Sequence, residues 1–76
     1  MNQARRETLS DISQKLDDLR SQIEEVLNEE EEAFSNMPES FQNGDKGESA
    51  QNAIDNLQQS ISSLEDAMTT LEDASQ

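Results

Sequence analysis

The chain has 76 residues, of which 18 are acidic and 5 are basic, so its formal net charge is −13 at pH 7. A chain of this size forms one small domain whose core supplies little stability. Cys and His are absent, which excludes disulfides and argues against zinc and di-iron sites, so oligomerisation remains the common source of extra stability. The scarcity of basic residues excludes a binder of nucleic-acid phosphates and a membrane-surface helix.

Apolar residues recur at alternating spacings of three and four in the first half of the chain, which predicts a helix from about residue 3 to about residue 35. A stripe that repeats in this way is typical of a coiled-coil seam. The residues of this first stripe are Leu9, Ile12, Leu16, Leu19, Ile23 and Val26. Leu27 and Phe34 widen the stripe.

Residues 36–47 are predicted to form a loop, because Pro38 cannot continue a helix and residues 43–47 are rich in turn formers. Residues 38–41 are a candidate for one isolated helical turn. Asp45 or Ser49 is the candidate N-cap of the next helix, and Asp45 with Glu48 has the spacing of a capping box.

A second apolar stripe predicts a helix from about residue 48 to about residue 74. Its residues are Ala50, Ile54, Leu57, Ile61, Leu64, Met68 and Leu71. Two helices of similar length with one short connection predict an all-α, antiparallel coiled-coil hairpin in one domain, residues 1–76. The register that buries every seam residue places Leu9 opposite Leu71 and Glu30 opposite Ala50. Arg5 and Arg6 then lie beside the acidic pair at residues 72–73.

Small residues follow the seam of the second helix at intervals of seven, which lets another backbone approach closely. Together with the wider stripe of the first helix, they predict that two hairpins associate as a homodimer and form an antiparallel four-helix bundle. The residues expected at this self-association surface are Leu27, Ala53, Ser60, Ala67 and Ala74. The alternative is a lone hairpin, in which the alanines serve only as good helix formers.

Acidic residues gather where the first helix ends, although the helix macrodipole is already negative there. Acidic residues at the negative end of a helix, without basic residues to compensate them, are unfavourable for stability and therefore indicate a functional role. The expected acidic partner-binding residues are Glu24, Glu25, Glu29, Glu30, Glu31, Glu32, Glu39, Asp45 and Glu48. Three apolar residues, Phe34, Met37 and Phe41, form a second candidate binding site at the hairpin tip. The alternative interpretation is a solvated acidic surface whose apolar residues close the hairpin core.

No residue constellation supports catalysis, a cofactor or a metal, so we expect a non-enzymatic module that binds another protein. A net charge of −13 on a rod ~40 Å long gives about one charge per ~3 Å, which is comparable with the spacing in duplex DNA once two hairpins associate. The chain could therefore block a nucleic-acid-binding protein by imitating DNA. The alternative is a structural adaptor whose seam and apolar tip hold partners together.

The chain carries the pair Arg5-Arg6, a Leu-Ser-Asp-Ile-Ser opening at residues 9–13, an acidic run at residues 29–32 and a Met-Pro-Glu-Ser turn at residues 37–40. In these features it resembles small acidic helical proteins of Gram-positive bacteria and their prophages. The resemblance implies a phage or mobile-element accessory protein. Combined with the DNA-like charge density, this gives an inhibitor of the anti-defence or anti-CRISPR type as the expected function. Residues 1–10 lack the pattern of a signal peptide, so we expect a cytoplasmic location.

Overall fold

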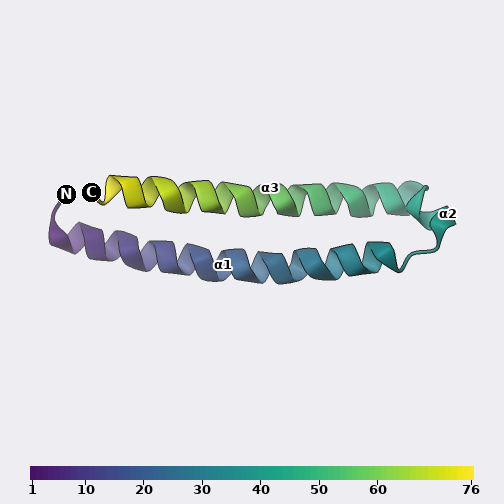
Figure 1. The fold of residues 1–76 in the computed structure, drawn as a ribbon, viewed down its shortest axis with the longest axis horizontal. Helices are drawn as coiled ribbons and strands as arrows, with labels where there is room; N and C mark the ends of the chain where they lie inside the picture. The colour runs from purple at the N-terminus through teal and green to yellow at the C-terminus, as the bar shows by residue number, and fades with distance from the viewer.

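The computed structural model describes residues 1–76 and contains helices but no strand, which confirms the all-α prediction. Helix α1 spans Gln3–Ser35, the short helix α2 spans Glu39–Gln42, and helix α3 spans Asp45–Ala74. Helices α1 and α3 lie side by side and run in opposite directions, with both chain termini at one end and α2 at the other (Figure 1). This hairpin measures 58 × 15 × 11 Å, so it is longer than the rod expected from the seam residues alone.

Side chains satisfy backbone groups at both ends of α1. At the start, the Asn2 side chain accepts a hydrogen bond of 2.9 Å from the Arg5 backbone N–H. At the end, Gln42 Nε2 of α2 donates to the carbonyl oxygens of Phe34 and Met37, each at 3.1 Å. These carbonyls belong to the turn where the helix runs out of backbone partners, so α2 closes the exposed end of α1.

Helix α3 begins at Asp45, three residues before the predicted start. Its N-cap is Gly44 and no side chain caps it, so the prediction that Asp45 or Ser49 serves as the cap is wrong. Asp45 and Glu48 instead lie inside the first turn, where the positive end of the macrodipole stabilises their carboxylates.

The seam of α3 consists of the predicted residues. Ala50 and Ile54 are buried, and they lie near the loop end of the hairpin. The remaining seam residues, each only half-buried, are Leu57, Ile61, Leu64, Met68 and Leu71. The core is therefore concentrated near the loop and thins toward the chain termini.

Helix α1 is rotated relative to the prediction. Its half-buried seam residues are Leu9, Ser13, Leu16, Arg20, Ile23, Leu27, Glu30 and Phe34. The prediction that Ile12, Leu19 and Val26 lie in the seam is wrong, because these side chains are 39%, 49% and 50% exposed. The row that includes Ser13 and Arg20 faces α3 in place of the row that includes Ile12 and Leu19.

The rotation has a physical reason at the loop end. It brings Leu27 and Phe34 into the seam, beside the segment of α3 that is most deeply buried. Arg20 tolerates a seam position because its aliphatic stem packs while its guanidinium binds Asp17 and Glu24 at 2.7 and 2.8 Å. Leu27, predicted at the self-association surface, is thus half-buried between the two helices.

The register of the two helices matches the predicted one. Glu30 and Ala50, predicted to face each other, line the same hollow at the loop end. At the other end, Arg6 Nε donates to the Ser75 carbonyl oxygen at 2.9 Å. The ion pairs of the chain are those of Arg20, so Arg5 and Arg6 form none with the acidic pair at residues 72–73.

The connection between α2 and α3 depends on a glycine. Gly47 is buried, and a Cβ atom built on it would lie 1.9 Å from the carbonyl oxygen of Gln42. No larger residue fits without moving the backbone of α2, which carries the side chain that closes α1. At Gly44, by contrast, the nearest atom to a built Cβ is 3.5 Å away, an ordinary contact.

Replacing Gly47 by Ala should therefore destabilise the hairpin by about 1–3 kcal/mol, because the methyl group overpacks the junction. Chemical denaturation followed by circular dichroism measures this change. The matched control is Gly44→Ser, which has room for its side chain and adds an N-cap hydroxyl, so it should leave stability unchanged or raise it. An equal loss in both variants would contradict the proposed role of Gly47.

Candidate functional site

Five of the 18 acidic side chains lie on one broad side of the hairpin. In an antiparallel helix pair, rows on the same flank of the two seams share a side. On α1 and α3, one such row directly follows the seam residues Leu16, Ile23, Leu64 and Leu71. The acidic residues of this row, called the acidic face below, are Asp17, Glu24, Glu31, Glu65 and Glu72.

Arg20 shows that the two helices contribute to the same negative field. The pKa of Arg20 is raised above its ordinary value, first by its hydrogen bond to Asp17 and then by the charge of Glu24. Glu65 on α3 adds a smaller contribution, although desolvation opposes these effects. The guanidinium therefore lies among acids of both helices, and it neutralises only part of their charge.

The opposite broad side carries almost no acid. We call it the apolar face, and its residues are Ile12, Leu19 and Val26 on α1 and Ala53, Ser60, Ala67 and Ala74 on α3. The rows that border it are mostly uncharged and polar, as in Gln22 and Asn56. The apolar face and its bordering rows together contain only one of the 18 acidic residues, Glu29. They contain three of the 5 basic residues, which are Arg5, Lys15 and Lys46. Charge is thus partitioned between the two broad sides.

The acidic residues predicted as one binding site surround the loop end and do not converge. Glu24 and Glu31 belong to the acidic face, whereas Glu29 borders the apolar face and Glu30 is half-buried in the seam. The others lie on the outer edges of the two helices or on α2, and they are Glu25, Glu32, Glu39, Asp45 and Glu48. The structure therefore supports an extended anionic surface more than a single site.

An open hollow of about 390 Å³ lies at the loop end. It is lined by Glu30, Met37, Asp45, Lys46, Ser49 and Ala50. The Lys46 ammonium lies 5.3 Å from the centre of the Phe41 ring, within reach of a cation–π interaction. Lys46 thus lies among acidic and aromatic groups of its own chain.

The three predicted tip residues do not form one exposed apolar patch. Phe34 and Met37 are half-buried and close the end of the hairpin core. Phe41 alone is well exposed, at 49%, and the Lys46 side chain lies over its ring. The geometry therefore favours a structural role for Phe34 and Met37, and it leaves Phe41 as the accessible tip residue.

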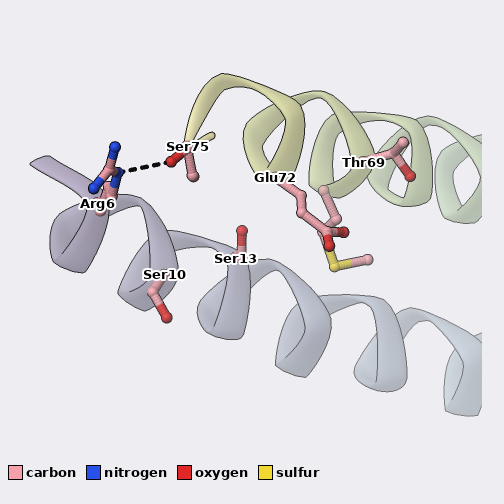
Figure 2. A pocket seen from close by; sticks show the side chains of 7 residues that line it. Arg6, Ser10, Ser13, Thr69, Glu72 and Ser75 are labelled. Carbon is pink, nitrogen blue, oxygen red and sulfur yellow. Dashed lines mark hydrogen bonds between the residues drawn. The ribbon is translucent and has the colours of Figure 1, made fainter. Parts of the chain in front are cut away.

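A second open hollow, also of about 390 Å³, lies between the two helices near the chain termini (Figure 2). Its lining residues are Arg6, Ser10, Ser13, Met68, Thr69, Glu72 and Ser75. Sequence reasoning missed it because it opens where Ser13 replaces Ile12 in the seam of α1. Figure 2 shows the Arg6 side chain held by the Ser75 carbonyl at its edge, and the groups present offer hydrogen bonds without a nucleophile–base pair.

No group of His, Cys, Asp or Glu side chains is arranged to hold a metal ion. Neither long helix contains a stretch apolar enough to cross a bilayer. Comparisons of the chain with protein-family models, with curated proteins and with solved structures gave no match. The distribution of charge and exposed apolar groups therefore carries the functional argument.

The acidic run at the end of α1 should cost stability, because Glu29, Glu31 and Glu32 lie at the negative end of the helix macrodipole. We expect the triple variant with Gln at these three positions to raise the Tm by about 5 °C. Thermal unfolding followed by circular dichroism measures this change. In the control variant Glu7→Gln, the lost carboxylate lies near the positive end of α1 and accepts a hydrogen bond from Gln3, so the Tm should fall or stay constant. A triple variant that gains no stability would refute the expected cost.

Proposed function

We propose that the chain is a non-enzymatic protein-binding module whose acidic surface occupies the basic, nucleic-acid-binding surface of a partner protein and so inhibits it. One observation supports the proposal above the others. All but one of the 18 acidic residues lie outside the apolar face and its borders, so anionic groups cover the other sides of a rod 58 Å long. Such a surface attracts basic grooves over long range and gives fast, salt-sensitive association.

Charge density makes a homodimer part of the proposal. A net charge of −13 over 58 Å corresponds to about one charge per ~4–5 Å, which is sparser than the ~1.7 Å spacing of duplex DNA. Two hairpins side by side, in the predicted four-helix bundle, bring the spacing to about 2 Å. The dimer, and not the single hairpin, therefore approaches the charge density of a nucleic acid.

The partner class follows from this charge and from the resemblance to prophage proteins. A nucleic-acid-binding effector of bacterial defence, of the restriction or CRISPR kind, presents a basic channel that an acidic rod can fill. In this proposal the chain makes no contact with nucleic acid and needs no cofactor. It acts by competing for the channel.

A structural adaptor is the second candidate function, and the exposure of Phe41 favours it. An accessible aromatic ring at the tip of a rigid rod is a common anchor in protein interfaces. The two candidates differ in what they need, because an adaptor depends on Phe41 whereas an inhibitor depends on the carboxylates.

The proposal predicts that neutralising the acidic face weakens capture of DNA- or RNA-binding proteins from a bacterial lysate. The test variant carries Gln at positions 24, 31, 65 and 72, and the matched control neutralises four acids on the outer edges, at positions 18, 25, 66 and 73. The immobilised chain is loaded at low salt and eluted with rising salt or with competing duplex DNA. We expect the test variant to lose most of the captured protein and the control to retain more.

Equal losses in the two variants would show that total charge, and not the acidic face, decides binding. Partners that resist both salt and duplex DNA would overturn the inhibitor proposal. If those partners are lost from a Phe41→Ala variant, the adaptor is the better description.

A further inference from the structure

The apolar face presents the exposed side chains Ile12, Leu19 and Val26 of α1 beside a row of small residues of α3, of which Ala53 and Ala67 are half-buried. We infer that this face is the dimer interface, and that a second copy of the chain packs on it about a two-fold axis parallel to the long axis of the hairpin. The inference deepens the dimer included in the proposed function by naming its surface and orientation. It does not require that the dimer binds a nucleic-acid-binding protein.

The shape of the apolar face favours a second copy of the chain as its partner. On the apolar face, large side chains from α1 lie beside small side chains from α3 at matching heights in the antiparallel register. Leu19, which is 49% exposed, lies level with Ser60. The neighbouring pairs, one helical repeat away in each direction, are Ile12 with Ala67 and Val26 with Ala53.

A row of large residues beside a row of small ones is complementary to itself. A two-fold axis along the hairpin places the large row of each copy on the small row of the other, without any shift in height. Leu19 of one copy then meets Ser60 of its partner. Large-to-small contacts of this kind fill space well between facing helices. A two-fold axis perpendicular to the long axis of the hairpin, which would place the two loops at opposite ends, packs α1 on α1 and α3 on α3. Large residues would then meet large residues, and small residues would meet small ones.

The charge distribution also favours contact through the apolar face. Contact through any other side of the hairpin would bring acidic rows of two chains together, each chain carrying −13. On the apolar face and its borders, Glu29 is the single acid among Arg5, Lys15 and Lys46. In the inferred dimer Arg5 faces Ala74 of the partner, close to the acidic C-terminal end of α3, so Arg5 meets opposite charge.

The area of the apolar face and the small core of the hairpin also favour a dimer. The broad side of the hairpin, 58 Å by 15 Å, offers on the order of 800 Å² to a partner, which is what each protein buries in a standard stable interface. The hairpin alone buries only Gly47, Ala50 and Ile54. A chain with so small a core gains much of its stability from association.

Sedimentation equilibrium of the purified chain, without any partner, tests the inference. We expect a dimer, and we expect Leu19→Ser and Ser60→Leu each to raise its dissociation constant at least about 10-fold, because each spoils the match of large to small residues. The double variant exchanges the two side chains between helices and should return within about 3-fold of the parent. Ser62→Leu, with the same change on a residue away from the face, should have no effect.

Several results would overturn the inference. A parent chain that stays monomeric at about 100 µM would remove the dimer. A Ser60→Leu variant that tightens association, or a double variant that fails to recover, would exclude the inferred pairing of rows. The helix content of each variant, measured by circular dichroism, shows whether it still folds. Leu19→Glu and its control Gln58→Glu provide a second test. Only Leu19→Glu should dissociate the dimer. Because no partner protein is present, these results stand apart from the proposed inhibition.

Discussion

Two helices packed side by side can bury only one line of side chains each, and this geometric limit governs the molecule. Here the line is well buried only where the loop holds the helices together, around Ala50 and Ile54. Elsewhere each seam residue keeps one flank in solvent. The hairpin thus has little core of its own and displays two broad sides whose composition is free to serve other purposes.

The loop end sets the rotation of α1, and the rotation sets the two surfaces. Gln42 closes the end of α1, and Gly47 lets α2 lie against α3, so the chain enters and leaves the turn in a fixed orientation. Phe34 lies in the seam at this end, and Arg20 lies in the same row of α1 at multiples of seven residues. Arg20 therefore lies in the seam, and Leu19 lies outside it. A few contacts in the turn are therefore transmitted along a helix of 33 residues.

Much of the fold could be predicted from the sequence. Pro38 and the glycines mark the break between the two long helices, and α3 has only one apolar stripe to bury. The rotation of α1 could not be predicted. Two rows compete there to flank Leu16, one through Ile12 and Leu19 and one through Ser13 and Leu27, and apolar content alone favours the wrong one. The hydrogen bonds of Gln42 depend on tertiary position and leave no local pattern. The charge partition was visible in principle, since counting acids row by row isolates the rows that contain almost none.

That partition links the anionic surface with the proposed assembly. Burying a face without carboxylates avoids the desolvation of charge that makes buried ion pairs costly. The same arrangement opposes wrong contacts, because two hairpins that meet through any other side bring acids against acids. In the proposed dimer the acids remain on the outer surface, where two copies combine into a denser anionic rod than either provides. The absence of acids from the two rows that contain Leu19 and Ser60 thereby accounts for both the proposed dimer interface and the anionic surface proposed to bind a partner.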